Sequence, residues 1–459
     1  MNLKIIVLGI VCLSCLFMLA SCRDKVDSMS SEFVVSGRIV DTLGTGIKDI
    51  KVYYGQDVFV LTDSLGSWQS GLINKSTTIQ PVDPDFTFTP EAVHVSDMTQ
   101  NIIFTARLMP HQNILSENVY AWFTHMQLAN GLLESTENSN FVSLYDNALA
   151  ALVFMARNDN SKAEAVLDFF NNRIDSELRV GKGGFSQFRD KNGTPNGKYW
   201  LGDNAWLLIA LNNYAAKVDN IKYQHLISEL SNWIRSLQDS DGSIRGGYNP
   251  DGSSLGKVTE GMIDAFNAVP GYDSFHSKLL NYLEINRWNP SEKLLISWPG
   301  NKYQYATDNH SWGFCTFEDF PYSVLEKADT YLTTKTASLN GIAITGYCFD
   351  IDKDDVWLEG TGQMVVAFQK AGKIQLANYY LAEMEKLITG SSLFPTTLGI
   401  PYASNLGTAY ATDPLWTGAD TKPCISSSAW YLFGILQFDP LAQEYVKNIP
   451  EEDKFWKNY

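Results

Sequence analysis

Positive charge is scarce in this sequence. Its 459 residues include 35 lysines and arginines against 51 aspartates and glutamates, which gives a formal net charge of −16 at pH 7. Proteins that bind nucleic acid use a basic stripe to neutralise phosphates, and nothing here supplies one. The composition therefore argues against a nucleic-acid partner. With 45% hydrophobic and 19% charged residues, the chain is globular in type rather than disordered.

Cysteine is also rare, with six residues in the whole chain. Three of them lie within the first 22 residues. The others are Cys315, Cys348 and Cys424, and their wide spacing matches no zinc-binding motif. Because three cysteines cannot all pair with one another, we expect them to be buried free thiols.

Motifs for cofactors and for common nucleophiles are missing as well. The chain has no P-loop, no dinucleotide-binding glycine pattern and no Gly-x-Ser-x-Gly motif. Its six histidines are dispersed and form no metal-binding set. The acidic run from Asp350 to Asp355 lacks the glycine of an EF-hand loop, so we interpret it as a solvated loop. We therefore expect neither a metal ion nor an organic cofactor.

The N-terminus has the pattern of a secretory signal. Lys4 precedes an apolar run over 5–20, which is short for a transmembrane helix. The run ends in Leu19-Ala20-Ser21-Cys22, which resembles a bacterial lipobox. The resemblance implies a lipoprotein signal peptide over 1–21, lipidation of Cys22, and a location at the outer membrane or cell surface of a Gram-negative bacterium. An ordinary signal peptide with a chance cysteine is the alternative.

Residues 22–32 then form a polar tether. It is somewhat similar to the acidic export signals of Bacteroidetes surface lipoproteins, although Arg23 and Lys25 weaken the match.

Residues 33–108 are predicted to form a small β-sandwich. Alternating segments such as 33–40, 58–62 and 101–106 are separated by turn residues every eight to twelve positions. Three motifs resemble carboxypeptidase-regulatory-like, transthyretin-type modules: Ser36-Gly37-Arg38-Ile39, Leu61-Thr62-Asp63-Ser64-Leu65-Gly66-Ser67-Trp68 and Phe86-Thr87-Phe88-Thr89-Pro90. The resemblance implies a spacer or adhesion module.

From residue 111 to 459 the apolar residues follow a period of 3.6, which is typical of helices. Segments 150–155 and 206–211 are apolar nearly all round, as buried helices are. Segments such as 161–174 and 223–237 are amphipathic and should lie outside. Buried and amphipathic helices therefore alternate along this part of the chain.

The buried helices start with a repeated pattern, at intervals of 57, 57, 48, 51 and 68 residues. The starts are Asp146-Asn147-Ala148-Leu149, Asp203-Asn204-Ala205-Trp206, Glu260-Gly261, Asp308-Asn309-His310-Ser311-Trp312, Glu359-Gly360 and Ser427-Ser428-Ala429-Trp430. Each interval leaves room for one helical hairpin and a loop. The pattern resembles the six-hairpin glycosidase superfamily, which implies an all-α (α/α)6 toroid after the all-β sandwich. A solenoid or an open array is the alternative.

Carboxylates begin five of the six predicted inner helices, and parallel inner helices would bring them to one mouth of the toroid. Asp203, Glu260 and Glu359 are the candidate catalytic residues because tryptophans or glycines accompany each of them. Capping of the helix N-terminus is the alternative for all five, and it is the interpretation we favour for Asp146.

Other residues near these helix starts are candidates for binding substrate. They are Asp146, Trp200, Trp206, Arg245, Asp308, His310, Trp357 and Tyr402. Indole faces pack against the C–H faces of sugars, and Arg245 would suit the carboxylate of an acidic sugar. For His310 a structural role is the preferred interpretation. Of the 12 tryptophans, we expect Trp200, Trp206, Trp312, Trp357 and Trp430 at the mouth.

Two carboxyl groups at a sugar site predict cleavage of a glycosidic bond. We predict Glu260 and Glu359 as the pair, with Asp203 binding hydroxyls or serving as base. Asp264, one turn after Glu260, either raises the pKa of Glu260 by like-charge repulsion or is a polar residue bonded within the helix packing. The resemblance implies a lipid-anchored glycoside hydrolase acting on an oligo- or polysaccharide. A non-catalytic glycan-binding surface protein and a polysaccharide lyase are the alternatives. The sugar, the linkage and the oligomeric state stay open.

Overall fold

The structure is a computed structural model that describes residues 32–458 except 42–43, 84–85, 109–113 and 443–446. The predicted signal peptide over 1–21 and Cys22 lie outside the described residues. The chain divides into two compact units, with the division between Met109 and Pro110. No helix in the described part of the chain combines the length and the apolar character needed to cross a membrane.

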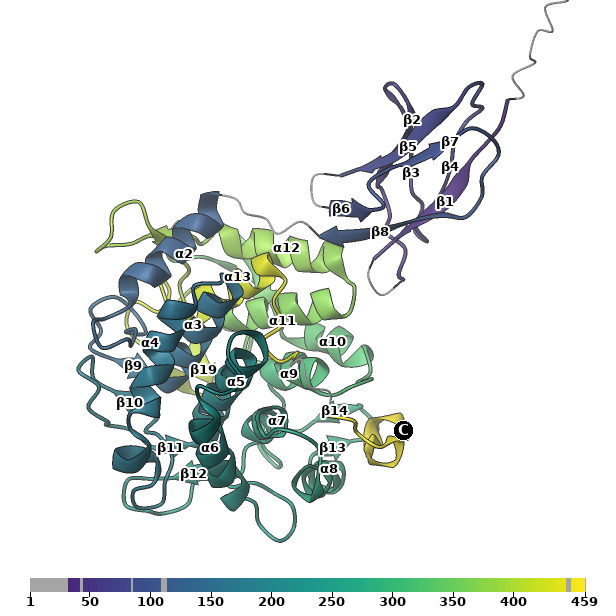
Figure 1. Cartoon of the computed structure of the whole chain (residues 1–459). Coiled ribbons are helices and arrows are strands. Elements are labelled where there is room, and N and C mark those ends of the chain that lie inside the picture. The colour runs from purple at the N-terminus through teal and green to yellow at the C-terminus, as the bar shows by residue number, and fades with distance from the viewer. Residues whose placement is uncertain (1–31, 42–43, 84–85, 109–113, 443–446, 459) are drawn as a thin grey trace, which may run out of the picture. The chain divides into compact units, whose positions relative to one another are not determined.

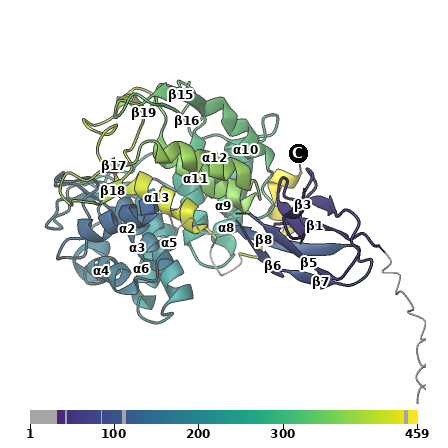
Figure 2. The same ribbon diagram turned by 90° about the horizontal axis from the view of Figure 1, so that it is seen from above.

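The N-terminal unit consists of two four-stranded sheets, in the orders β4-β1-β8-β6 and β3-β2-β5-β7. Figure 1 and Figure 2 show the strands from two sides. The strands are β1 (Ser36–Val40), β2 (Lys51–Gly55), β3 (Val58–Leu61), β4 (Ser67–Gln69), β5 (Thr77–Val82), β6 (Phe86–Thr89), β7 (Val93–Val95) and β8 (Ile102–Leu108). Alternate residues of both sheets, such as Ile39, Phe104 and Val52, are buried in one shared core. The period-2 pattern of the sequence thus forms the inner faces of two packed sheets.

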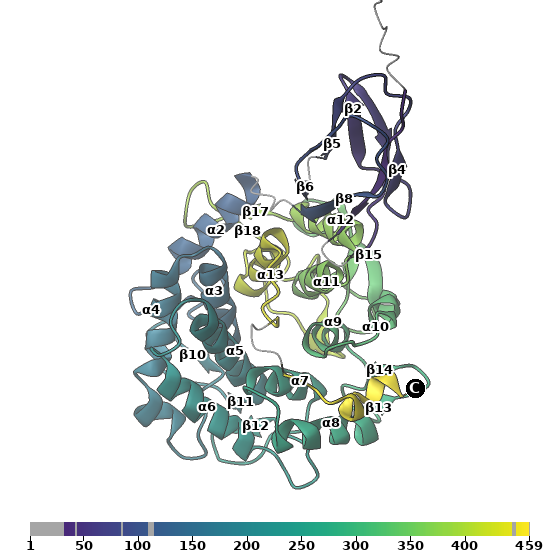
Figure 3. The same cartoon turned by 45° about the vertical axis from the view of Figure 1, so that its right-hand side comes forward.

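The C-terminal unit is a ring of helices. Its inner helices are α3 (Leu144–Ala156), α5 (Leu201–Lys217), α7 (Thr259–Ala268), α9 (Thr307–Thr316), α11 (Leu358–Lys370) and α13 (Ile425–Leu436). Each inner helix contacts the next, and α13 contacts α3, so the ring is closed (Figure 3). Closure excludes the solenoid and the open array.

A second layer of helices surrounds the inner ring. It comprises α2 (Ile114–Met126), α4 (Asn160–Asn171), α6 (Gln224–Ser236), α8 (Ser274–Asn286), α10 (Ser323–Lys327) and α12 (Ile374–Glu385). The inner helices are buried on nearly all sides, whereas the outer helices bury one face; α6, for example, buries Leu226, Leu230 and Trp233. The alternation of apolar and amphipathic segments in the sequence is therefore the alternation of these two layers.

Short two-stranded ribbons lie in the loops between the hairpins. They are β9 (Val142–Ser143) with β10 (Phe188–Arg189), β11 (Tyr199–Trp200) with β12 (Gly247–Tyr248), β13 (Trp288–Asn289) with β14 (Leu294–Leu295), β15 (Leu332–Thr336) with β16 (Ala343–Tyr347), β17 (Thr389–Gly390) with β18 (Leu398–Gly399), and β19 (Thr408–Tyr410) with β20 (Asp413–Pro414). Two of these pairs, β9–β10 and β11–β12, join the loop before one inner helix to the loop before the next.

The fourth residue of four inner helices holds a nearby loop. Asn147 of α3 accepts a hydrogen bond from the backbone N–H of Leu133 and donates one to its carbonyl, at 2.9 and 3.0 Å. Asn204 of α5 makes the same two bonds to Phe185, at 2.8 and 2.9 Å. In α11 Thr361 accepts from Tyr347 N–H, and in α13 Ser428 accepts from Ile400 N–H. We call these four residues the loop anchors.

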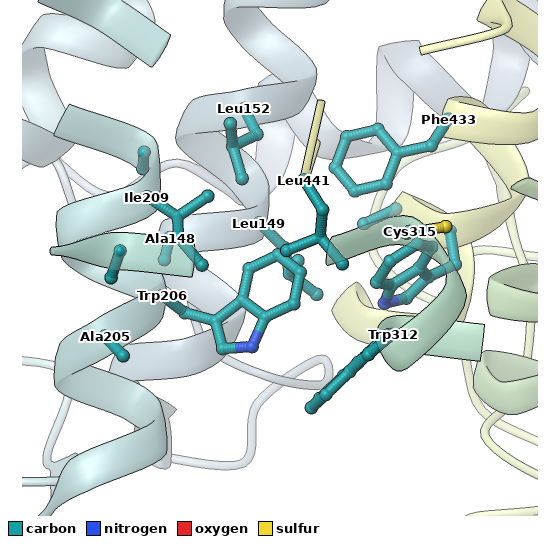
Figure 4. Close-up of a cluster of buried hydrophobic side chains, with 14 of the residues drawn as sticks. Ala148, Leu149, Leu152, Ala205, Trp206, Ile209, Trp312, Cys315, Phe433 and Leu441 are labelled. Atoms are coloured by element: carbon teal, nitrogen blue, oxygen red, sulfur yellow. The ribbon is translucent and has the colours of Figure 1, made fainter. Parts of the chain in front are cut away.

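The segment after α13 crosses the C-terminal ends of the inner helices. The amide of Asn213 donates to the carbonyl of Pro440, and that of Asn267 donates to the carbonyl of Leu441. Leu441 itself is buried beside Leu149 and Phe433 (Figure 4). Apolar side chains therefore fill the centre of the ring at this end.

Candidate functional site

A cavity of about 660 Å³ opens among the N-terminal ends of the inner helices. Its lining includes five carboxylic acids from five different helices: Asp146 (α3), Asp203 (α5), Glu260 (α7), Asp308 (α9) and Glu359 (α11). The second residue of every inner helix lines it, and these residues are Tyr145, Gly202, Glu260, Asp308, Glu359 and Ser426. The second residue of each of the six inner helices therefore contributes to the wall of one cavity.

Aromatic side chains form much of the cavity wall. Trp200, Trp206, Trp312, Trp357 and Tyr402 all line it, together with Trp416 from a loop. The rings of Trp206 and Trp312 lie 5.2 Å apart and point toward each other, next to the apolar side chains that fill the ring (Figure 4). Cavities with apolar walls and a few convergent polar groups are the usual form of a small-molecule site.

Glu359 is held by a chain of hydrogen bonds. The hydroxyl of Tyr145 donates to its Oε1 at 2.7 Å, and the indole N–H of Trp430 donates to that hydroxyl at 2.9 Å. Gln363 donates to the same carboxyl oxygen at 3.3 Å, and Ser426 also bonds the carboxyl group. Burial raises the pKa of Glu359 to about 7, although these bonds oppose the shift. The carboxyl group is therefore fixed in orientation and poised to gain or lose a proton near neutral pH.

Glu260 has a different environment. Burial, and then the negative charges of Asp308 and Asp203, raise the pKa of its carboxyl group well above the usual range. Asp264 lies one turn further along α7 and is 1% exposed; among the described residues neither of its oxygens has a hydrogen-bond partner of good geometry, although the Trp206 indole lies beside it. The charge of Glu260 raises the pKa of Asp264, the second effect after burial. The charges that raise the pKa of Glu260 are those of Asp308, Asp203 and Glu359, and not that of Asp264 as we expected. Burial and the neighbouring carboxylates therefore favour the protonated form of Glu260.

Burial also raises the pKa values of the remaining three acids. It raises the pKa of Asp146 to about 8 and those of Asp203 and Asp308 to about 7. Asp146 bonds the side chain of Ser135, and Asp203 bonds the backbone of Tyr145. A buried acid without a cationic partner is costly to ionise, and its pKa is therefore raised. Raised pKa values of this kind are frequent at functional sites.

Helix capping accounts for part of this arrangement, because Asp203 and Asp308 each bond their own backbone in the first turn of a helix. The N-cap of α3 is Ser143, whose side chain accepts from the backbone N–H of Asp146, so Asp146 is not the capping residue. Asp308 does accept a 2.6 Å hydrogen bond from the backbone of Asn309 in the first turn of α9. The N-cap positions of α5, α7, α9 and α11 have no side-chain hydrogen bond.

Two residues predicted to bind substrate lie away from the cavity lining. His310 is buried against the carbonyl of Val324, 2.7 Å away, and burial lowers its pKa to about 4. Arg245 donates to the carbonyls of Leu237 and Ser236 and forms a salt bridge with Asp239 at 3.3 Å. Both contacts are structural, so neither residue is assigned a role at the cavity. Trp430 is likewise buried behind the wall, where it supports Tyr145.

Tyr145 is the main residue of the cavity that the sequence did not single out. It directly precedes Asp146 at a repeated helix start, and that position was the available signal. Trp416, Ser426 and Cys424 also line the cavity. They lie in a long loop or at a helix start without a carboxylate, where neither pattern nor spacing distinguishes them.

The acidic run between Asp350 and Asp355 packs against a neighbouring loop. Asp350 accepts from the backbone of Ala411, and Asp354 accepts from the backbone and hydroxyl of Thr408. In the described part of the chain, one group of three side chains brings its potential metal ligands within 4.8 Å of one another: Cys348, Asp354 and Asp355. The run is therefore partly buried and bonded rather than the solvated loop that we expected.

The sequence matches no family model and no curated protein. Several solved structures are similar in fold. A glycosidase variant has a TM-score of 0.54 at 11% identity, covering 71% of this chain and 96% of that chain. A glycosidase variant in complex with glucose has a TM-score of 0.52 at 12% identity, covering 72% and 96%. A sugar epimerase from a ruminal bacterium has a TM-score of 0.51 at 11% identity, covering 70% and 96%. The fold is thus the six-hairpin toroid that glycosidases and a sugar epimerase share.

Proposed function

We propose that this protein is a glycoside hydrolase. The observation that carries the proposal is the convergence of five carboxylic acids and five tryptophans on one cavity at the end of the toroid. Acids with different environments provide the acid and base that glycosidic cleavage needs, and indole faces bind sugar rings. The glycosidases of similar fold support the same assignment.

Glu260 is the general acid in this proposal, and Glu359 is the general base. The raised pKa of Glu260 favours its protonated form, which donates the proton to the glycosidic oxygen as the bond from that oxygen to C1 breaks. Glu359, fixed by Tyr145, accepts a proton from the water that attacks C1. Asp203 lies across the ring from Glu359, on α5, where it binds sugar hydroxyls. The proton gained by Glu359 returns to Glu260 through solvent after the product leaves.

Epimerisation is the second candidate, because one solved structure of similar fold is a sugar epimerase. Epimerisation at carbon needs side chains that remove a proton and return it, a task that histidine most often performs, and no histidine is among the described residues that line the cavity. Hydrolysis is therefore the function that the site supports best.

A glycan panel tests the assignment. The purified chain is incubated with neutral, amino and acidic oligosaccharides, and new reducing ends, altered sugar stereochemistry and absorbance near 235 nm are measured. We expect new reducing ends that are lost in Asp203→Asn, Glu260→Gln and Glu359→Gln chains of unchanged melting temperature. An epimer without cleavage would identify an epimerase, and an unsaturated product absorbing near 235 nm would identify a lyase. If all three variants merely unfold more easily, the acids have a structural role and the proposal fails.

We also propose that lipidation of Cys22 anchors the protein at the outer membrane or cell surface. The proposal rests on the lipobox-like sequence at Leu19-Ala20-Ser21-Cys22. A Cys22→Ser chain expressed with its signal peptide is expected to move from the membrane fraction to the soluble fraction. Membrane association that persists in this variant would contradict the proposal.

A further inference from the structure

The described residues that line the cavity include five carboxylic acids and no cationic side chain to balance their charge. Among the described residues that line it there is no lysine, arginine or histidine. Two carboxyl groups suffice for glycosidic cleavage, so three of the five exceed what the chemistry needs. A cavity of this kind repels anionic ligands and attracts cations.

The titratable groups at the cavity come from five of the six inner helices and from two loops. They are Tyr145 and Asp146 on α3, Asp203 on α5, Glu260 and the underlying Asp264 on α7, Asp308 on α9, Glu359 on α11, and Tyr402 and Cys424 in the loops. Every one of them has a raised pKa. Protons therefore take the place of a missing counter-charge, and a bound cation would displace some of them.

The arrangement suits an organic cation better than a metal ion. The acids stand on five different helices, and no three of them bring their oxygens within 4.8 Å of one another among the described residues. The indoles of Trp206, Trp312 and Trp357 line the same cavity. Indole faces attract ammonium groups and also pack on sugar rings.

We propose that the cavity selects saccharides that carry a protonated amine over the corresponding neutral saccharides, and that it excludes uronic acids. This proposal depends on the proposed function in one respect, which is that the ligand is a sugar. An ammonium group would lie among the carboxylates, where the charge-assisted hydrogen bonds replace the protons that burial holds there. The carboxylate of a uronic acid would meet like charge and no cation. This selectivity also disfavours the lyase alternative, which needs a group that neutralises a uronate.

The test compares sugars that differ only in charge. Binding to the full chain is measured by ligand-observed NMR for matched amino, neutral and uronic sugars of the gluco, galacto and manno configurations. We expect the amino sugar of at least one configuration to bind about tenfold more tightly than its neutral counterpart, and every uronic acid to bind more weakly than both. If no amino sugar exceeds its neutral counterpart, or if a uronic acid equals it, the proposal fails.

Two further measurements assign the selectivity to the cavity. The affinity for the amino sugar should rise as the pH increases from about 5.5 to 7, because the acids ionise while the amine stays protonated; the affinity for the neutral sugar should change little. Asp308→Asn should reduce the preference for the amine several-fold, whereas Asp175→Asn, an acid-to-amide change at an exposed position outside the cavity, should leave it intact. A pH-independent preference, or one that Asp308→Asn leaves intact, would overturn the proposal.

This experiment separates the inference from the proposed function. Amine selectivity without any hydrolysis would leave the inference standing and remove the hydrolase. Hydrolysis of neutral or acidic glycans without amine selectivity would support the hydrolase and contradict the inference.

Discussion

Replacing Glu260 by glutamine is expected to lower kcat about a thousandfold on natural glycans, with little change in melting temperature. A general acid contributes about 10²–10⁴-fold, and glutamine keeps the shape of the side chain but cannot release a proton. The raised pKa of Glu260 gives the expected pH dependence. A general acid works while protonated, so activity of the unmodified chain should fall as the pH rises through this pKa, and Glu260→Gln should lose that limb of the profile.

Substrates with different leaving groups distinguish the general acid, Glu260, from the general base, Glu359. An aryl glycoside with an acidic phenol needs little protonation, so Glu260→Gln should recover much of its rate on that substrate. Glu359→Gln should not recover, because the attacking water still lacks a base. Asp175→Asn serves as the control, since Asp175 is exposed and its ion pair with Arg179, at 2.7 Å, lies outside the cavity. Equal losses on both substrates in both variants would contradict these roles.

Replacing Arg189 by methionine is expected to cost about 3–5 kcal/mol in the free energy of unfolding. The guanidinium group is fully buried and bonds both carboxyl oxygens of Glu177, at 2.7 and 3.1 Å. Without it the buried Glu177 carboxylate loses both hydrogen bonds and the ion pair that Arg189 supplies. Gln187 and Phe188, which directly precede Arg189, line the cavity, so KM should rise as well.

Urea-induced unfolding measures this change, and the chain offers a matched control. Arg179 lies at the surface and forms ion pairs with Asp175 at 2.7 Å and with Glu229 at 2.8 Å, so Arg179→Met should cost much less than Arg189→Met. Changing both partners, Arg189→Met with Glu177→Gln, should recover part of the loss because no uncompensated charge stays buried. Equal costs for Arg189→Met and Arg179→Met would show that burial of the pair does not matter.

Much of the fold was predictable because it depends on periodic patterns. The inner helices are apolar on nearly all sides and the outer ones on one face, and this contrast is visible in the sequence. Short elements were not predictable. The three-residue strands β4 and β7 and the five-residue helix α10 are too short for a period, and they form because long-range neighbours supply their partners. The buried pair of Glu177 and Arg189 joins residues whose sequence context is that of an exposed loop.

The sequence predicted the acids of the candidate site, but it did not predict which position each acid occupies in its helix. The repeat aligns Asp203 with Glu260, yet Asp203 is the third residue of its helix and Glu260 the second. This difference of one position rotates a side chain by about 100° around a helix, and both still reach the cavity. Tyr145 occupies the second position of its helix without carrying a carboxylate, so a search for acids misses it. Contacts such as its bond to Glu359, 214 positions away, arise only from closure of the ring.

The loop anchors show that neighbouring residues of the repeat have separate tasks. Asp146 and Asp203 face the cavity, while Asn147 and Asn204, one position later, bind the loops at Leu133 and Phe185. A loop can therefore change in length or sequence between its attachment points without moving the helix that carries the acid. Relatives built on this plan are expected to exchange specificity through whole loops while keeping their acids in place, and grafting a loop between its attachment points is the natural way to re-engineer this protein.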